Sequence, residues 1–370
     1  MKKVLFILGT RPEGIKLSPL ITAFKQSAIL ETKVCITAQH RELLDEVLDF
    51  FSIIPDYDLD IMKEAQTLGE ITSKILTSVT KVVLENQPDL IIVQGDTTTA
   101  FAGALVAFYN KIKIAHIEAG LRSHNKFSPF PEEINRVYIS KIADFHFAPT
   151  AITLENLKTE GINENAWNVG NTVIDALLFG LKILENDKIK LEKKYNYLQP
   201  NRRLILVTTH RRENFGEPLR GICNVLLKVT EEYPDVEIIF PVHPNPNVRT
   251  IVENLLKPNK NIHLIQPLPY AELIWLMKKS HLILTDSGGI QEEAPSLGKP
   301  VIVMREETER MEGVEAGTAI LAGNRFQNIY HHLKSLLSDS ALYNKMSNAI
   351  NPYGDGHTSQ RILKILEDVL

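Results

Sequence analysis

The stretch "LTDSGGIQEEAPSLGKPVIVM", residues 284–304, contains a complete strand–helix–strand pattern. An apolar run leads into "SGG", a short helical segment follows, and a second apolar run begins after "GKP". Two strands joined by a helix are typical of a parallel sheet, because parallel neighbours need a crossover connection. The fold of the whole chain then depends on whether this unit repeats.

The same alternation runs through both halves of the chain. Apolar runs that predict buried parallel strands lie at 3–8, 32–37, 90–94, 113–117, 145–149 and 167–169, and again at 204–209, 237–242, 262–266, 281–286, 301–304 and 319–323. Helical patterns lie near 14–26, 41–51, 67–86, 97–109, 132–143 and 171–184, then near 217–232, 247–256, 270–280, 288–297, 324–337, 340–349 and 358–370. This order predicts an α/β fold with two doubly wound, Rossmann-like domains.

The alternation of predicted strands and helices is interrupted between the two halves. Residues 185–203 are charged and lack a clear core face, so we expect a linker there between an N-terminal domain (1–184) and a C-terminal domain (204–350). Ligands of doubly wound sheets bind outside the carboxyl ends of the strands. We therefore expect the active site in the cleft between the two domains.

Composition excludes several classes of protein. At 370 residues the chain is long enough for two domains, and its net charge of -4 argues against general nucleic-acid binding. No apolar segment approaches the roughly 20 residues that span a bilayer, and we expect a cytoplasmic protein without a membrane partner. Cys35 and Cys223 are expected to be buried free thiols, and no metal or cofactor site stands out.

Polar residues gather at the ends of the first set of strands. Arg11 and Lys16 in "GTRPEGIK" would suit a phosphate, although a solvated loop with a capped helix is the alternative. Asp96 follows the strand 90–94, where it could also simply cap a helix. Glu118 follows the strand 113–117, and Glu132 lies a short loop further on. We expect Arg136 to be a structural partner one turn after Glu132.

The strand ends of the second half carry a different set of groups. His210 is followed by paired arginines, which favours a site over a structural histidine, and His243 lies between prolines as a ligand contact or a rigid turn. The glycines of "SGG" let a backbone approach a diphosphate closely, or serve only a tight turn. The candidates for binding a nucleotide here are Ser287, Gly288, Gly289, Glu293, as a ribose acceptor, and Arg310.

At this point the chain resembles the non-hydrolysing UDP-N-acetylglucosamine 2-epimerases over nearly its whole length. The motifs that carry the resemblance include "GTRPEGIK", "GDTTTAFA", "HIEAGLRS", "SPFPEEINR", "HRRENFG", "PVHPNPNV", "LTDSGGIQEEAPSLGKPVIVMR" and "NPYGDG". The resemblance implies a glycosyltransferase-B-type fold, in which the final segment, 351–370, packs back on the N-terminal domain. It also implies a homodimer.

The resemblance also implies roles for single residues. Catalysis would fall to Asp96, Glu118, Glu132 and His210; substrate binding to Arg11, Lys16, Asp96, Glu118, His210, Ser287, Gly288, Gly289, Glu293 and Arg310. A second UDP-N-acetylglucosamine would act as an activator at Gln39, Arg41, Glu132, Arg211 and His243. The implied reaction inverts C2 through elimination of UDP to bound 2-acetamidoglucal, with no cofactor.

The chain departs from the commonest family pattern at a few positions, without loss of a charged catalytic position. Leu268 and Leu273 stand where some members place Gln and Phe near the uracil, and "HPNP" replaces a common motif in the activator region. Three alternatives stay open: a hydrolysing epimerase or one for another UDP-amino sugar, a glycosyltransferase on the same fold, and a UDP-sugar-binding regulator.

Overall fold

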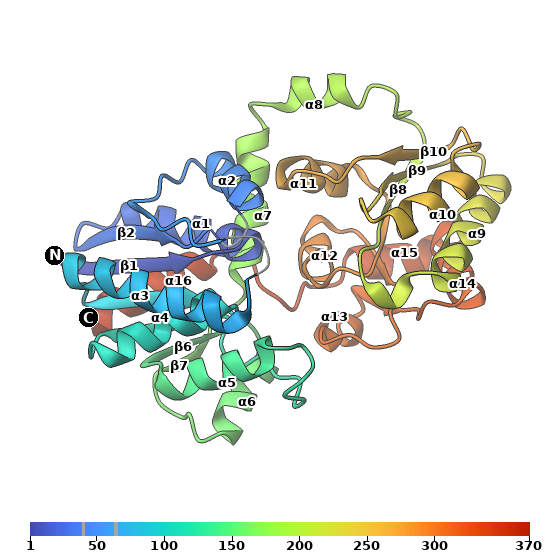
Figure 1. Ribbon diagram of the computed structural model, residues 1–370. Helices are drawn as coiled ribbons and strands as arrows, with labels where there is room; N and C mark the ends of the chain where they lie inside the picture. Colours follow the sequence, from blue (N-terminus) through green and yellow to red (C-terminus); the bar gives the residue numbers. More distant parts are fainter. Residues whose placement is uncertain (39–40, 63–65) are drawn as a thin grey trace. The chain divides into compact units, whose positions relative to one another are not determined.

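The computed structural model describes residues 1–38, 41–62 and 66–370, apart from the side chain of Arg212. The chain divides into two compact units (Figure 1): unit 1 is Met1–Phe179 with Tyr353–Leu370, and unit 2 is Gly180–Pro352. None of the helices in the described part of the chain has the length and apolar character needed to span a membrane.

Unit 1 contains a seven-stranded parallel sheet in the order β3-β2-β1-β4-β5-β6-β7. Its strands are β1 (Lys2–Leu8), β2 (Leu30–Ile36), β3 (Tyr57–Asp58), β4 (Leu90–Gln94), β5 (Lys113–Ile117), β6 (Phe145–Ala148) and β7 (Ala166–Asn168). The central strands are covered on both faces, so their sequences read as nearly continuous apolar runs.

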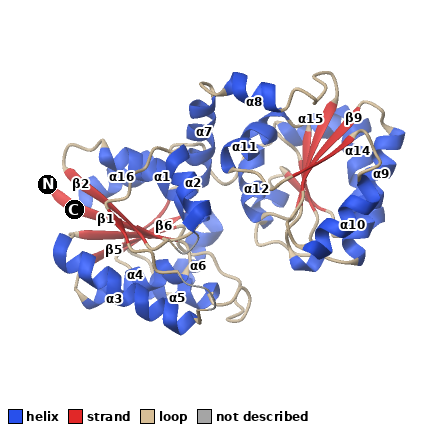
Figure 2. Ribbon diagram, turned by 45° about the horizontal axis from the view of Figure 1, so that its top comes forward, coloured by secondary structure: helices blue, strands red, loops and turns tan. Residues whose placement is uncertain are grey.

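Helices lie on both faces of this sheet (Figure 2). The helix α1 (Arg11–Lys25) packs against the C-terminal helix α16 (Thr358–Val369) on one face. The other face carries α3 (Leu68–Asn86), α4 (Thr98–Tyr109) and α5 (Glu132–Ile142). Of these, α4 lies in the middle and packs against both α3 and α5. The remaining helices of the unit are α2 (Arg41–Phe50), α6 (Ala151–Thr159) and most of α7 (Thr172–Leu184).

The C-terminal segment is fixed to unit 1 by polar contacts as well as packing. The buried carboxylate of Asp175 accepts hydrogen bonds from the backbone N–H groups of Thr358 (3.2 Å) and Ser359 (2.7 Å), at the start of α16. The carbonyl of Tyr353 accepts the N–H of Asn171 at 2.7 Å. The contacts of Asp175 satisfy N–H groups that a helix start leaves without partners.

Unit 2 contains a six-stranded parallel sheet in the order β10-β9-β8-β11-β12-β13. Its strands are β8 (Arg203–Thr208), β9 (Val236–Pro241), β10 (Ile262–Ile265), β11 (Leu282–Thr285), β12 (Val301–Val303) and β13 (Ala319–Leu321). Its helices are α8 (Lys188–Lys194), α9 (Glu217–Glu232), α10 (Pro246–Leu256), α11 (Tyr270–Lys279), α12 (Gly288–Glu293), α13 (Met311–Glu315), α14 (Phe326–Ser338) and α15 (Ser340–Ser347), with 3-10 turns η1 (Arg212–Asn214) and η2 (Ala294–Leu297). The apolar faces of α9, α10 and α14 form one core with the sheet.

In both sheets, the order in which the chain adds strands reverses at an equivalent place. The chain builds outward from β1 through β2 and β3, then returns to place β4 on the other side of β1; in unit 2, β8 and β11 have the same relation. Loops leave the carboxyl ends of these two strands in opposite directions, which opens a binding position between them. The predicted fold of two doubly wound parallel sheets is confirmed, and Cys35 and Cys223 are free and buried as predicted.

The expectation for the segment 185–203 is wrong in one respect, because this segment does have a core face. It contains α8, which buries Leu191, and Tyr195, the residue after this helix, is also buried. The Tyr195 ring stacks on Trp275 of α11 and its hydroxyl donates to Glu272. The apolar positions of α8 are too few for a helical pattern to stand out among the lysines. The sequence analysis also does not predict the strand β3 or the helices α6 and α13, which are short or have a weak apolar pattern.

Candidate active-site groups in both units

Three carboxylates lie close together at the carboxyl ends of β4 and β5 in unit 1. Asp96 follows β4, Glu118 follows β5, and Glu132 begins α5; the charges of Glu118 and Glu132 both act on Asp96. Glu118 takes the left-handed backbone conformation, with φ of 62°, which is costly for a residue that is not glycine. Such strain is typical of positions where a side chain must point in a required direction.

The Glu118 carboxylate is almost covered and has polar partners from three segments. The ammonium of Lys16 lies 2.5 Å from its Oε1, with side-chain exposures of 12% for Lys16 and 8% for Glu118. Gln94 donates to its Oε2, and the Asn171 amide lies 3.5 Å from Oε1. Lys16, predicted as a cation for a phosphate, therefore supplies positive charge to a proposed catalytic carboxylate in this structure.

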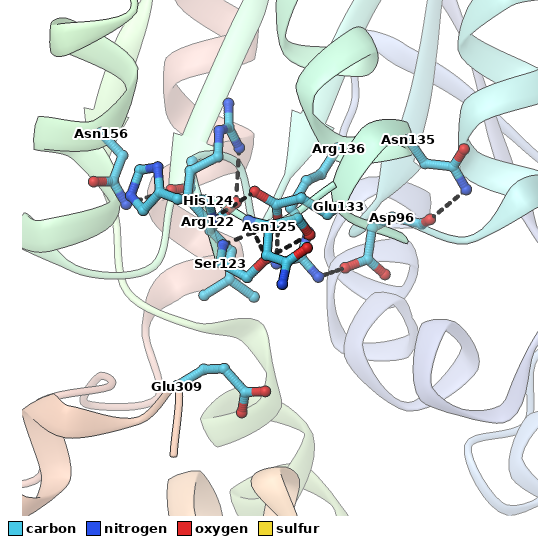
Figure 3. A network of polar contacts seen from close by, with 12 residues as sticks. Asp96, Arg122, Ser123, His124, Asn125, Glu133, Asn135, Arg136, Asn156 and Glu309 are labelled. Carbon is cyan, nitrogen blue, oxygen red and sulfur yellow. Dashed lines mark hydrogen bonds and ion pairs between the residues drawn. The ribbon is translucent and has the colours of Figure 1, made fainter. Parts of the chain in front are cut away.

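Asp96 has a different partner, the guanidinium of Arg136 (Figure 3). Burial raises the pKa of Asp96, the Arg136 charge opposes that shift, and the negative charges of Glu118 and Glu132 add to it. The backbone carbonyl of Asp96 accepts from Asn135 at 2.9 Å, so α5 holds this loop at two points. Thr97, the next residue, caps α4 by accepting from Ala100 N–H, which corrects the alternative that Asp96 is the cap.

The expected partner of Arg136 was wrong. Its guanidinium contacts Asp96 and Glu133 (3.4 Å), rather than Glu132 one turn earlier. Glu133 in turn accepts the backbone N–H groups of Ser123 (3.0 Å) and His124 (2.9 Å), which holds the loop before α5. The Glu132 carboxylate is half-buried, and the structure records no hydrogen bond for it among the described residues.

Glu13 joins the loop after β1 to the loop after β4. It is 1% exposed; its Oε2 accepts from Gly9 N–H (3.0 Å), Thr10 N–H (2.8 Å) and the Thr10 hydroxyl (2.8 Å), and its Oε1 accepts from the Thr97 hydroxyl (2.7 Å). Burial raises the pKa of Glu13 to about 7, although these hydrogen bonds oppose the shift. Arg11, half-buried, begins α1 directly after this turn.

In unit 2, the imidazole of His210 lies against the carboxylate of Asp286. Its Nδ1 lies 3.0 Å from Asp286 Oδ1, while the imidazole is 47% exposed and Asp286 is fully buried. His210 follows β8 and Asp286 follows β11, so the pair spans the reversal point of the second sheet. This pairing of a half-exposed imidazole with a buried carboxylate is the usual way of orienting a general base or acid.

The "SGG" turn lies directly after Asp286 and meets Arg310. A Cβ atom added at Gly288 would lie 3.1 Å from Cζ of Arg310, so the absence of a side chain there allows the guanidinium to lie against the turn. Arg310 also contacts Glu292 (3.0 Å) and Glu309 (3.4 Å). Glu293, expected to face a ribose, is 5% exposed and accepts from the Tyr270 hydroxyl at 2.7 Å.

The residues predicted for an activator lie in both units. Arg41 is already paired with Asp58 (2.6 Å) and Asp60 (3.1 Å) in unit 1. In unit 2, Nε of Arg211 is buried and is without a hydrogen-bond partner in the part of the chain that the structure describes. His243 Nδ1 accepts from Asn245 N–H at 3.2 Å, and Gln39 lies outside the described residues.

The sequence interpretation missed two buried carboxylates, Glu13 and Asp286. Both lie inside motifs of the sequence analysis: Glu13 in "GTRPE", two residues after Arg11, and Asp286 in "LTDSGG", directly before Ser287. A signal for Glu13 was present, since Thr10 and Glu13 have the spacing of a capping box. Nothing comparable marks Asp286, because its partners are distant along the chain.

Comparison with known proteins identifies the family. The family model described as UDP-N-acetylglucosamine 2-epimerase matches residues 22–367. The UDP-N-acetylglucosamine 2-epimerase of Salmonella borreze is 52% identical over 377 residues and covers 100% of both chains. The crystal structure of UDP-GlcNAc 2-epimerase from Neisseria meningitidis, bound to UDP-GlcNAc, matches with a TM-score of 0.92 and 48% identity over 99% of this chain and 100% of that one.

A more distant structure extends the comparison. The Methanocaldococcus jannaschii UDP-GlcNAc 2-epimerase, in complex with UDP-GlcNAc and UDP, matches with a TM-score of 0.83 and 39% identity over 99% of each chain. With a family match over most of its length and relatives about half identical from end to end, this chain belongs to the UDP-N-acetylglucosamine 2-epimerase family.

Proposed function

We propose that the protein interconverts UDP-N-acetylglucosamine and UDP-N-acetylmannosamine by inverting C2 of the sugar. The single observation that carries the proposal is the group of three carboxylates, Asp96, Glu118 and Glu132, in a chain of this family. Relatives whose structures hold UDP-GlcNAc support the choice of substrate.

The chemistry explains why several carboxylates are needed. The C2–H bond of the sugar is not acidic, so the proposed route removes this proton while the C1–O bond to UDP breaks. The products are bound 2-acetamidoglucal and UDP. Return of the UDP oxygen to C1, with protonation of the other face of C2, gives the epimer. One group must take a proton and another must give one, which favours two carboxylates in different surroundings.

Asp96 and Glu118 meet that requirement in unit 1. Burial raises the pKa of Asp96, and the neighbouring carboxylates add to the shift against the charge of Arg136. Glu118 has the ammonium of Lys16 at 2.5 Å. We propose that these two carboxylates and Glu132 handle the protons at C2.

Unit 2 is proposed to bind the UDP group. In the turn at Ser287, Gly288 and Gly289, the backbone N–H groups of the two glycines begin α12 and are proposed to face the diphosphate, and Arg310 brings a guanidinium against the turn. The Ser287 N–H already donates to the Thr285 hydroxyl at 3.0 Å. Positive charge near a leaving diphosphate stabilises the transition state of its departure. Arg11 and Lys16 of unit 1 belong to the same proposed set, and His210 is proposed to act on the glycosidic oxygen or a sugar hydroxyl.

A second UDP-N-acetylglucosamine is proposed as an activator that binds Arg211, His243, Arg41, Gln39 and Glu132. The buried Nε of Arg211, for which the described residues provide no acceptor, is the observation in favour. An activator that is also the substrate gives a sigmoidal dependence of rate on substrate concentration in the forward direction. A hyperbolic dependence over the whole range would contradict this part of the proposal.

The test of the main proposal is incubation with UDP-N-acetylglucosamine in D2O, followed by NMR. We expect deuterium at C2 and a UDP-linked manno product. Net release of free N-acetylmannosamine would instead indicate a hydrolysing epimerase. Absence of exchange at C2 without an added acceptor would exclude the epimerase and leave the glycosyltransferase or the regulator.

A further inference from the structure

The buried carboxylate of Asp286 lies outside the proposed catalytic set and touches one of its members. Its Oδ1 lies 3.0 Å from His210 Nδ1. Its Oδ2 accepts from the Thr209 hydroxyl (2.8 Å), Arg211 N–H (3.0 Å) and the Asn214 amide (2.9 Å). The His210 N–H lies 3.1 Å from both oxygens. Oδ1 therefore faces the imidazole and shares the backbone N–H of His210 with Oδ2, while Oδ2 also accepts from three further donors.

We propose that Asp286 is a positioning residue that holds His210 in the tautomer with a proton on Nδ1 and a free acceptor at Nε2. The proposal rests on the proposed function in one respect, the role of His210 in epimerisation. The tautomer itself is a property of unit 2 and can be measured without substrate.

The charge state of Asp286 supports this assignment. Burial by itself would raise the pKa of Asp286, but the hydrogen bond and charge of His210, together with Arg211 N–H and the Asn214 amide, lower it to about 2. At neutral pH the carboxylate is ionised and can only accept hydrogen bonds. The Nδ1 atom that faces it must then carry the proton, which leaves the lone pair of Nε2 available in the neutral ring.

The surroundings of Asp286 also predict the effect of an amide at this position. In Asp286→Asn, the carbonyl oxygen must take the place of Oδ2, because three donors from Thr209, Arg211 and Asn214 point there. Asn214 cannot simply turn its own amide around, since its nitrogen also donates to the Met304 carbonyl at 3.0 Å.

The amide nitrogen of the substituted side chain would therefore face His210 Nδ1. A donor in that place requires Nδ1 to accept, so the imidazole proton moves to Nε2. The substitution keeps the shape of the side chain and every contact made to Oδ2, loses only the second contact of the His210 backbone N–H, at Oδ1, and reverses the tautomer of His210. A merely structural role for Asp286 predicts no such reversal.

The experiment uses full-length protein labelled with 15N-histidine, at pH 8 and without substrate. The His210 signals are assigned by their loss in His210→Asn. We expect a protonated Nδ1 in the wild type and a protonated Nε2 in Asp286→Asn. Thr209→Val is the matched control: it removes one donor to the same carboxylate without touching the imidazole, so its tautomer should stay that of the wild type.

Turnover in the D2O assay then tests the catalytic consequence. We expect Asp286→Asn to lose about a hundredfold or more in turnover, the scale of a misplaced general acid or base, while Thr209→Val changes turnover little. Equal losses in the two variants would overturn the proposal, because they would show that only the turn matters. A wild type with its proton on Nε2 overturns it even if Asp286→Asn fails to fold.

The two parts of the inference fail separately. If the wild type shows no epimerisation at all, the proposed function is wrong while the spectra still decide whether Asp286 sets the tautomer. If the tautomer reverses in Asp286→Asn and turnover is unchanged, Asp286 positions an imidazole that the reaction does not use, and the proposal as a catalytic device is overturned.

Discussion

The reversal points of the two sheets each contain a buried carboxylate, and the two behave in opposite ways. Glu13 in unit 1 is 1% exposed and Asp286 in unit 2 is 0% exposed. Both accept several hydrogen bonds from backbone and side-chain donors. Burial raises the pKa of Glu13 to about 7, whereas the pKa of Asp286 is lowered to about 2.

The partners explain the difference. The groups that oppose burial at Glu13 are neutral: the Thr97 and Thr10 hydroxyls and the backbone N–H groups of Gly9 and Thr10. At Asp286 the hydrogen bond and charge of His210 are added to similar neutral donors. Neutral donors satisfy the hydrogen-bonding capacity of a buried carboxylate but do not fully replace its hydration. The imidazole of His210 adds a further donor at Nδ1, and a positive charge whenever the ring is protonated.

The largest effect is expected from a carboxylate of unit 1. Glu118→Gln removes a proposed proton-handling group while keeping the size of the side chain, and we expect turnover to fall about a thousandfold. UDP affinity should change far less than turnover, because Glu118 is not among the proposed UDP contacts and only its partner Lys16 belongs to that set. Turnover by NMR and UDP titration by calorimetry measure the two quantities. Retained turnover would remove Glu118 from the catalytic set.

The fold could be predicted from sequence because its evidence is local. In the sequence, each strand is an apolar run, and its end is marked by a glycine or a polar residue. Examples are Glu118 after 113–117 and His210 after 204–209. The contacts between these side chains could not be predicted in the same way. Arg136 reaches Asp96, 40 positions away, rather than Glu132 one turn back, and that choice depends on how α5 lies beside the loop after β4.

The contact between Asp286 and His210 could not be predicted from the sequence either. Asp286 is 76 residues away along the chain, and only the parallel pairing of β8 with β11 brings the two together. A pairing of this kind requires the strand order, which alternation of strands and helices alone does not determine. The electrostatic difference between Glu13 and Asp286 therefore becomes visible only in the structure.

The second prediction concerns the contribution of Glu13 to the pH dependence of the free energy of unfolding. Because the folded-state pKa (about 7) lies above the ordinary value of 4.5, the folded protein binds more protons between these values, and stability is lost as pH rises through this window. The shift corresponds to about 3 kcal/mol in the free energy of unfolding. Glu13→Gln keeps the capping-box geometry and should lack this dependence.

The measurement is urea unfolding of the wild type and Glu13→Gln from pH 5 to pH 8. The difference between the two proteins isolates Glu13 from the other titrating groups. We expect the wild type to lose stability relative to the variant as the pH rises. Parallel pH profiles would show that Glu13 is ionised in the fold and that the neutral donors suffice.

The third prediction has the opposite sign. The folded-state pKa of Asp286, about 2, lies below the ordinary value of 3.8, so its contribution is present above pH 4 and is lost as the pH falls toward 2. The wild type should lose about 2 kcal/mol more than Asp286→Asn between pH 5 and pH 2. Acid unfolding of both proteins measures this, and identical acid limbs would mean that His210 does not stabilise the ionised carboxylate.

The smallest effect concerns the turn after Asp286. A methyl group at Gly288 would lie 3.1 Å from Cζ of Arg310 and force the guanidinium to move by a few tenths of an ångström. We expect Gly288→Ala to weaken UDP binding about threefold, or roughly 0.6 kcal/mol. Gly69→Ala in α3 is the control, since nothing lies within 4 Å of its added Cβ and it should leave UDP affinity unchanged.

The size of the loss at Gly288 separates two explanations of why glycine stands there. A loss of a few fold is what a displaced Arg310 predicts, and Arg310→Lys should then give a comparable loss, because it keeps the charge and shortens the reach. A loss of a hundredfold or more would mean that the methyl group meets the nucleotide itself. An unchanged affinity, beside an unchanged Gly69→Ala, would show that neither the space at Gly288 nor the place of Arg310 contributes to binding UDP.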